Sequence, residues 1–105
     1  MRPLIFGYMR VPDDMPDEEV KLVEDQMLAY AEAQGGALGA VFHEFVHGSL
    51  SAFEELVRAV EQSGAPHAVV PSYRDLALTR ALQDVMILRI EYATGAQVAA
   101  LDEDR

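Results

Sequence analysis

The sequence contains no cysteine, which excludes disulfide bonds, thiolate catalysis and cysteine-based zinc sites. It also lacks a basic run, because 8 Lys and Arg residues stand against 18 Asp and Glu residues and give a formal charge of −10. This charge repels a phosphate backbone and disfavours direct nucleic-acid binding by the chain on its own. No apolar run approaches the roughly 20 residues of a membrane span, and the first residues form no secretory signal. We therefore expect a cytoplasmic protein.

Half of the 105 residues are hydrophobic, which suits a single domain over residues 1–105 with one core. Residues 4–9 form a short apolar run without alternation, which is typical of a strand covered on both faces. Because Pro12 has no N–H to donate to a neighbouring strand, we expect pairing to stop there. The carboxyl ends of parallel strands form the functional edge of such sheets, so Arg10 and Pro12 are expected at that edge.

The rest of the chain alternates between helical and strand patterns. Helices are expected at residues 18–34, from the serines at 49–51 to residue 63, and at 76–94. Further strands are expected at residues 38–46, 67–71 and 97–101, followed by an acidic tail at 102–105. Asp17 is the expected N-cap of the first helix. Ser49 or Ser51 is expected to cap the second helix, with Glu54 completing a capping box.

Apolar side chains recur at helical spacing in all three helices and mark the faces expected to pack in the core. These core positions are Val20, Val23, Met27, Tyr30 and Ala31; Phe53, Leu56, Val57 and Val60; and Leu78, Leu82, Val85, Met86 and Ile90. The order β-α-β-α-β-α-β predicts an α/β domain, a small three-layer sandwich with a mainly parallel four-stranded sheet.

Four stretches, in this order and spacing, resemble the catalytic domain of the serine recombinases, the resolvase/invertase family. Residues 6–12 (Phe-Gly-Tyr-Met-Arg-Val-Pro) are similar to its opening strand, Gly-Tyr-x-Arg-Val-Ser, and residues 25–35 are similar to its first helix. Residues 41–49 are similar to its second strand and the Gly-Ser turn that follows. Residues 69–76 are similar to its third strand and the loop bearing an Asp-Arg pair. The resemblance covers nearly the whole chain and implies the resolvase catalytic-domain fold.

The position of the nucleophile departs from the family pattern. The resemblance implies an attacking serine where this chain has Pro12, and proline has no hydroxyl with which to attack a phosphodiester. Ser49 and Ser72 are expected in loops at the same edge of the sheet. Because no base or orienting partner is apparent beside either serine, we interpret both as loop or capping residues.

The family's arginine cluster, which the resemblance implies would stabilise the phosphoryl transition state, is also incomplete. Arg10 matches one member, but the Asp-Arg pair is inverted here as Arg74-Asp75, and the next arginine position is Leu78. The arginine expected early in the second helix falls near residues 51–52. Arg10 is then expected either to bind a phosphate or carboxylate, or to pair with a local acid such as Asp75.

A competing motif lies at residues 43–47, where His43-Glu44-Phe45-Val46-His47 spells H-E-x-x-H. On a helix this spacing places two imidazoles on one face to bind zinc, with the glutamate as general base. On a strand the two histidines are about 13 Å apart, too far to share one ion. Nearby glycines and branched residues favour the strand, and no spacing indicates a third ligand, although His67 or a downstream glutamate is available.

The sequence therefore predicts a catalytically inactive serine-recombinase-like domain without DNA strand exchange of its own. Its expected role is a protein-interaction or regulatory module, whose partner is another protein or a second copy in a homo-oligomer such as a dimer. We expect no cofactor, metal or membrane contact. Two alternatives stay open: a zinc-dependent hydrolase using His43, Glu44 and His47, and a site at the strand ends where Arg10 and Arg74 hold an anion or nucleotide-like ligand.

Overall fold

The structure is a computed structural model that describes residues 2–102, so the last three residues of the acidic tail lie outside the described part. Its strands are β1 (Leu4–Arg10), β2 (Ala37–Glu44), β3 (His67–Val70) and β4 (Gln97–Ala100). The helices are α1 (Asp17–Ala33), α2 (Ser51–Ser63) and α3 (Arg80–Thr94), with a short 3₁₀ helix η1 (Tyr73–Asp75). The strands form one parallel sheet in the order β2-β1-β3-β4.

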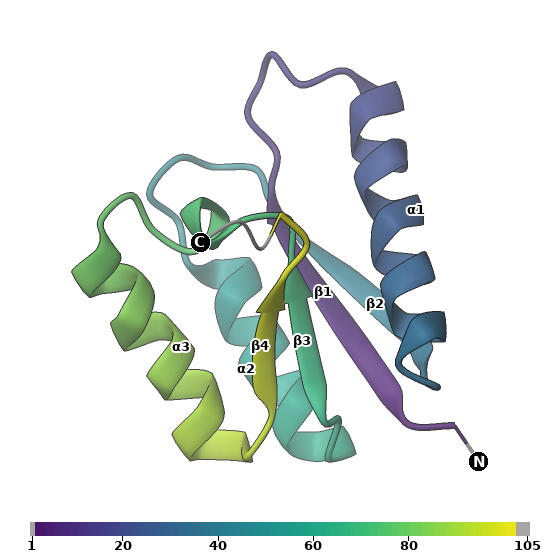
Figure 1. The fold of residues 1–105 in the computed structure, drawn as a ribbon. Helices are drawn as coiled ribbons and strands as arrows, with labels where there is room; N and C mark the ends of the chain where they lie inside the picture. Colours follow the sequence, from purple (N-terminus) through teal and green to yellow (C-terminus); the bar gives the residue numbers. More distant parts are fainter. Residues whose placement is uncertain (1, 103–105) are drawn as a thin grey trace.

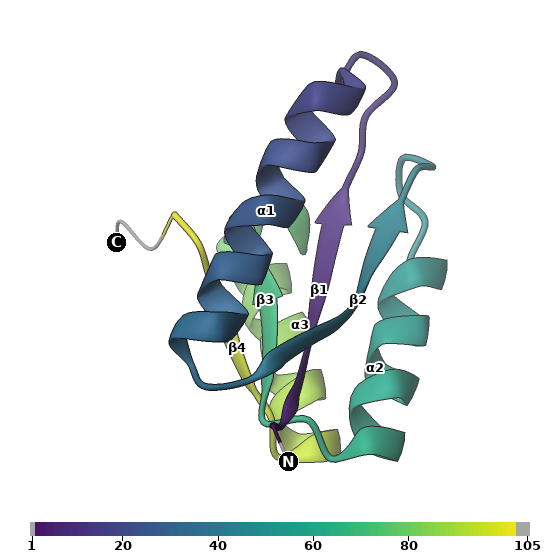
Figure 2. The ribbon, with the colours of Figure 1, turned by 90° about the vertical axis from the view of Figure 1, so that its right-hand side faces the viewer.

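Helices cover both faces of this sheet. α1 lies on one face, whereas α2 and α3 lie side by side on the other (Figures 1 and 2). The predicted three-layer α/β sandwich is therefore confirmed. None of the helices within residues 2–102 is long and apolar enough to cross a membrane.

β1 occupies the centre of the sheet, with all side chains from Ile5 to Met9 buried. It pairs with β2 along its whole length and with β3 near its start. Gly7 lets α1 pack closely on this strand, because a Cβ there would lie 2.5 Å from the Sδ atom of Met27 and would force that side chain to shift. Strand pairing ends with the Val11 N–H, which donates to the Glu44 carbonyl at 2.9 Å, so the predicted stop at Pro12 is confirmed.

Two apolar clusters fill the layers, because alternate residues of each strand point to opposite faces of the sheet. The cluster beneath α1 is built from Ile5, Met9, Met27, Ala31 and Val69. The cluster beneath α2 and α3 includes Phe6, Tyr8, Phe53, Leu56, Val60, Val70, Met86 and Ile90. The predicted inward faces of the first two helices are thus confirmed.

The predicted helix caps are largely wrong. Asp17 is the first residue of α1 rather than its cap, and the capping position is Pro16, which makes no side-chain bond. Leu50 occupies the cap of α2 and also makes no side-chain bond, although the Oγ of Ser49 accepts from the Ser51 N–H at 3.2 Å. Glu54 does not reach back to form a capping box, because its carboxylate pairs with Arg89 on α3.

The predicted start and inward face of the third helix also need correction. α3 begins at Arg80, where the Oγ1 of Thr79 accepts from the Leu82 N–H at 3.2 Å. Met86 and Ile90 are buried as predicted, but Leu78 and Val85 are 82% and 61% exposed, and Leu82 is also exposed. The apolar residues of this helix therefore lie on more than one face, and only the face with Met86 and Ile90 packs on the sheet.

Candidate functional site

Arg10 ends β1 and ties three segments together at the carboxyl edge of the sheet. Its Nε donates to the Asp75 carbonyl at 2.8 Å, and its guanidinium also donates to the Ser49 carbonyl at 3.2 Å. Its main-chain N–H donates to the Asp75 carboxylate at 2.9 Å. The two residues are thus joined as predicted, but through main-chain groups on each side rather than through a guanidinium–carboxylate pair. Burial raises the pKa of Asp75, although the N–H and charge of Arg10 oppose this shift.

Glu44 ends β2 and is only 3% exposed, yet four donors satisfy its carboxylate. Oε1 accepts from the Tyr8 hydroxyl and the Phe53 N–H at 3.0 and 3.2 Å. Oε2 accepts from the Ser51 hydroxyl and the Ala52 N–H at 3.2 and 3.1 Å. The carboxylate at the end of β2 therefore caps the amino end of α2, the next element along the chain.

The electrostatics of this group favour the ionised acid. Burial by itself raises the pKa of Glu44, but hydrogen bonds from the Ala52 N–H and the Tyr8 hydroxyl outweigh it and hold the pKa below its ordinary value. Burial raises the pKa of the Tyr8 hydroxyl, so this group remains a donor. Sequence reasoning missed this role, because Glu44 ends the preceding strand seven residues before α2 and so lies outside the short spacing of a capping box.

Pro12 lies exposed at a cavity of about 350 Å³ where β1 and β2 end. The cavity is lined by Arg10, Val11, Pro12, Asp13, Glu44, Phe45, Val46 and His47. Within the described part of the chain, this lining offers neither a hydroxyl nor a second arginine. The place that the resemblance assigns to the nucleophile therefore presents no hydroxyl among the described residues that line it.

A larger cavity of about 510 Å³ lies between the start of α2 and α3. It brings together Arg10 and Arg74, the two arginines predicted to hold an anion, and adds Arg89. Arg89 pairs with Glu54 and lies 5.9 Å from the centre of the Phe53 ring. The remaining lining is mostly apolar and includes Leu50, Leu76, Leu78, Leu82, Val85 and Met86.

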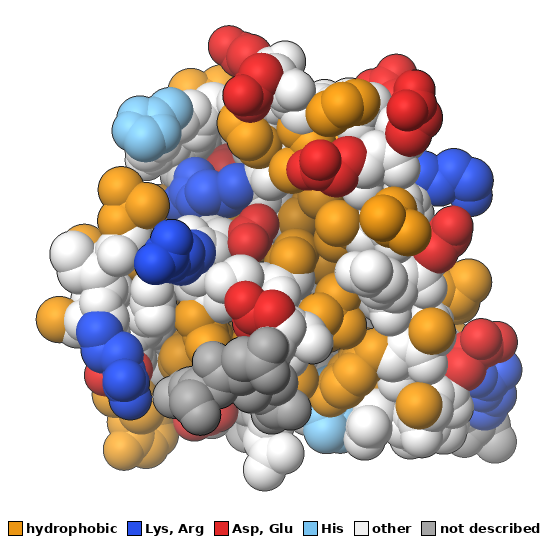
Figure 3. Space-filling model, turned by 45° about the horizontal axis from the view of Figure 1, so that its top comes forward, with side chains coloured by type: hydrophobic (Ala, Val, Ile, Leu, Met, Phe, Trp, Pro, Cys, Tyr) orange, Lys and Arg blue, Asp and Glu red, His pale blue; other side chains and the backbone are white. Residues whose placement is uncertain are grey.

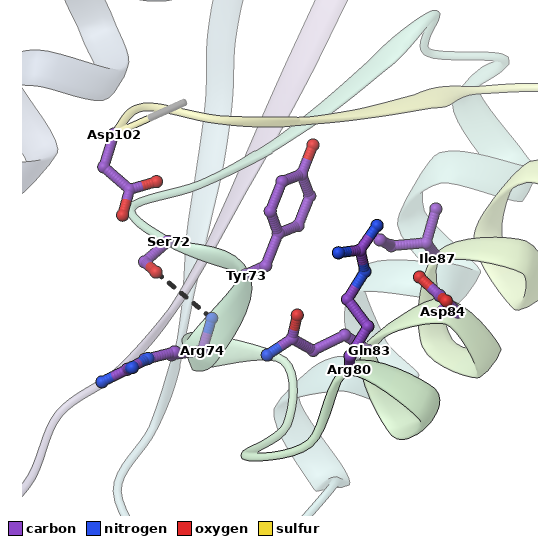
Figure 4. A pocket seen from close by; sticks show the side chains of 8 residues that line it. All are labelled: Ser72, Tyr73, Arg74, Arg80, Gln83, Asp84, Ile87 and Asp102. Carbon is purple, nitrogen blue, oxygen red and sulfur yellow. Dashed lines mark hydrogen bonds between the residues drawn. The ribbon is translucent and has the colours of Figure 1, made fainter. Parts of the chain in front are cut away.

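Ser72 and Arg74 border a third cavity, of about 310 Å³, on the other side of α3 (Figure 4). The Oγ of Ser72 accepts from the Arg74 N–H at 3.2 Å and so caps η1, which confirms its interpretation as a capping serine. The side chain of Arg74 extends away from that of Arg80, so the two do not form a cluster (Figure 4). The carboxylates of Asp84 and Asp102 share the same cavity and oppose an anion there.

Ser49 is the other hydroxyl that the sequence left as a candidate. Its Oγ lies 3.0 Å from the Oγ of Ser51, in the turn that leads into α2. It also accepts from the Ser51 N–H, and the Ser51 hydroxyl continues the chain of bonds to Glu44. This serine therefore belongs to the cap of α2, and it faces another hydroxyl rather than an imidazole or a lysine.

The H-E-x-x-H motif lies on the predicted strand and does not form a helix. His43 lies in β2, where its Nε2 is 2.7 Å from a carboxylate oxygen of Glu24 on α1 and its ring stacks on Phe45. Glu44 is buried in the cap of α2, and His47 lies exposed beyond the strand. Residues 2–102 contain no group of three His, Cys, Asp or Glu side chains that could hold a metal ion. Nothing in the geometry supports the zinc hydrolase.

No protein-family model and no curated protein matches the sequence. Solved structures do match. The C-terminal catalytic domain of ISC1926 TnpA, an IS607-like serine recombinase, matches with a TM-score of 0.75 and 15% identity over 97% of this chain and 72% of that chain. The N-terminal catalytic domain of TP901-1 integrase matches with a TM-score of 0.70 and 17% identity over 95% of this chain and 78% of that chain. The chain therefore has the fold of the serine recombinase catalytic domains.

Proposed function

We propose that this domain keeps the serine-recombinase fold without cutting DNA, and that it serves as a protein-interaction or regulatory module in the cytoplasm. The observation that carries the proposal is the cap of α2. The amino end of a helix is a natural site for an anion such as a phosphate. Here the carboxylate of Glu44 already accepts from the N–H groups of Ala52 and Phe53. The chain thus fills this site with its own negative charge.

Two further features support the proposal that this domain does not cleave DNA. Pro12 lies where the resemblance places an attacking serine, and proline offers no oxygen nucleophile. The guanidinium of Arg10 is held by the carbonyls of Asp75 and Ser49, so its hydrogen bonds serve the fold. Stabilising a phosphoryl transition state requires several preorganised cations around the reacting group. Among the described residues that line the cavity at Pro12, Arg10 is the one arginine or lysine.

The charge of the chain supports a partner other than DNA. The formal charge is −10, and Asp13 lines the cavity beside Pro12. A bound phosphate would meet this carboxylate at the mouth of the cavity, where the like charges repel. A folded α/β domain that does not cleave DNA still has exposed apolar side chains that a protein partner can contact.

A plasmid assay tests the proposal. Purified protein is incubated with supercoiled plasmid in magnesium-free buffer, and the mixture is then denatured. The DNA is examined for nicked or linear forms and for a covalent adduct with the protein. An active serine recombinase with a plasmid carrying its own site is the positive control. We expect unchanged supercoils and no adduct. Strand cleavage by this chain, or an adduct through any serine, would overturn the proposal.

The second candidate function is anion binding, which the shared cavity of Arg10 and Arg74 favours. Arg74 is exposed, and its guanidinium can turn toward a phosphate or carboxylate in this cavity. Thermal unfolding is measured with inorganic phosphate and with nucleotides, for the native chain and for Arg74→Ala. Arg58→Ala, on the exposed face of α2, is the matched control. A rise in Tm that Arg74→Ala alone abolishes supports the site, and an unchanged Tm with every anion contradicts it.

A further inference from the structure

The cavity of about 510 Å³ between the start of α2 and α3 differs in charge from the rest of the chain. Its described lining includes three arginines and His47 but no Asp or Glu, although the chain has 18 acidic residues against 8 Lys and Arg residues. Lys and Arg side chains lie along the α3 side of the carboxyl edge, beside hydrophobic side chains (Figure 3). A recess that gathers cations in an acidic chain favours a negatively charged occupant.

The walls of this cavity are mostly apolar. On α3, Leu82 and Val85 line it and are 56% and 61% exposed, and Leu50 and Phe53 line it at the start of α2. Covering exposed apolar side chains with other apolar groups is favourable, because it removes apolar surface from water. The volume lies within the range of about 300–1,000 Å³ that is typical of small-molecule sites. The occupant is therefore expected to be a small molecule with an apolar body.

The three arginines are not equally available to a ligand. Arg89 already pairs with Glu54, so its charge is balanced. The guanidinium of Arg10 donates to two carbonyls, and its main-chain N–H donates to the Asp75 carboxylate, which offsets part of its charge. The side chain of Arg74 is exposed at the cavity and has no hydrogen bond or ion pair within residues 2–102. Arg74 is therefore the cation that is left for a ligand.

A carboxylate matches this cation in shape and in charge. Its two oxygens accept in parallel from the planar guanidinium of Arg74, which gives a bidentate pair. A carboxylate carries one negative charge, whereas a phosphate monoester carries about −1.5 to −2 at neutral pH, and less cationic charge is left here to balance it. Because the walls beside Arg74 are apolar, hydrocarbon is the best match for the rest of the ligand.

We infer that this cavity binds a small monocarboxylic acid, with the carboxylate on Arg74 and the hydrocarbon chain along Leu82 and Val85. This inference rests on the anion binding given above as the second candidate function, and it names the class of anion. It also gives a role to Leu78, Leu82 and Val85, which the sequence predicts to be buried and which the described chain leaves exposed. The bound hydrocarbon chain covers them.

NMR titration of the main-chain amide signals measures the affinity and locates the site. The ligands are butanoate, hexanoate and octanoate, with 1-octanol as the chain without the charge and inorganic phosphate as the charge without the chain. Each buried methylene strengthens binding about fourfold, so each step of two carbons is expected to lower Kd by roughly tenfold. We expect 1-octanol and phosphate each to bind at least about tenfold more weakly than octanoate.

Two pairs of variants test the two ends of the ligand. Arg74→Ala is expected to weaken octanoate at least about tenfold and to leave 1-octanol unchanged. Its control is Arg80→Ala, an exposed arginine outside the cavity lining whose side chain extends away from Arg74 (Figure 4). Leu82→Asn is expected to weaken octanoate and 1-octanol alike, with Leu88→Asn, an exposed leucine of the same helix outside the lining, as control. Because all four side chains are exposed, each variant is expected to give the amide spectrum of a folded protein.

The outcomes separate this inference from the proposals on which it rests. Phosphate that binds at Arg74 as tightly as octanoate overturns the carboxylic acid and leaves the anion site standing, whereas no shift with any anion overturns both. A Kd that does not fall with chain length, or 1-octanol that binds as tightly as octanoate, also overturns the inference. A peptide with an apolar C-terminal residue that binds more than tenfold more tightly than octanoate would assign the cavity to a protein chain end instead. The plasmid assay tests the inactive domain independently of all these results.

Discussion

Replacing Glu44 by glutamine removes the charge that caps α2 and preserves the shape of the side chain. In the native chain Tyr8 and Phe53 donate to one carboxylate oxygen, and Ser51 and Ala52 donate to the other. The amide keeps one acceptor and turns an NH₂ group toward one of the two main-chain N–H groups. An orphaned buried N–H costs about 1–3 kcal/mol, and loss of a charge at a helix end costs up to about 2 kcal/mol. We expect Glu44→Gln to lose about 2–4 kcal/mol of unfolding free energy.

The pH dependence of this loss identifies its cause. Because folding lowers the pKa of Glu44, the stability that comes from its ionisation is complete above the unfolded value of 4.5 and is lost as pH falls through the folded pKa. Glutamine has no such loss. The difference in unfolding free energy between the native chain and Glu44→Gln is therefore expected to shrink as the pH falls below 4.5.

Urea unfolding followed by circular dichroism, repeated from neutral to acid pH, measures this difference. Glu55→Gln is the control, because Glu55 is exposed on the same helix, and its substitution is expected to change stability by less than about 0.5 kcal/mol. A Glu44→Gln chain as stable as this control at neutral pH would refute the cap. A large difference that does not change with pH would refute its electrostatic origin.

Three other substitutions test neighbouring contacts. Tyr8→Phe removes a buried donor to Glu44 and is expected to lower stability by about 1–3 kcal/mol and to raise the pKa of Glu44, which NMR titration follows. Gly7→Ala forces a Cβ against Met27 and is expected to cost about 1–3 kcal/mol; if Met27→Ala does not relieve part of this cost in a double-mutant cycle, the contact is not the reason. His43→Ala removes the partly exposed pair with Glu24 and the stacking on Phe45, and it is expected to cost less than about 1 kcal/mol in urea unfolding. Metal analysis is expected to give the same zinc content before and after; a stoichiometric zinc lost in this variant would favour the hydrolase.

The fold could be predicted from the sequence because its strongest signals are local. The apolar run at residues 4–9 predicted a strand covered on both faces, and the alternation of strand and helix patterns predicted a parallel sheet. The strand ends were predicted one or two residues too late in β2, β3 and β4. In β2 the pairing ends with the Val11 N–H on the Glu44 carbonyl, which leaves Phe45 and Val46 exposed.

The site and the outer face of α3 depend on contacts that a local pattern does not encode. Serine spacing predicted a cap from the turn itself, but the donor groups bind Glu44, which ends the preceding strand and is brought back to them by the loop between β2 and α2. Leu82 and Val85 do lie in α3, so their spacing was a true helical signal, whereas Leu78 precedes the helix. The spacing indicated an apolar helix face. The sequence could not show that the described part of the chain leaves this face exposed.

The most direct test of an inactive fold compares the native chain with Pro12→Ser, which restores the missing hydroxyl. Both proteins are incubated with supercoiled plasmid, denatured, and measured by intact mass for a covalent DNA adduct. We expect no adduct from either, because Arg10 remains bound to main-chain carbonyls and Glu44 still fills the end of α2. An adduct on the native chain would contradict the central claim, and one on Pro12→Ser alone would show that the rest of the site is intact.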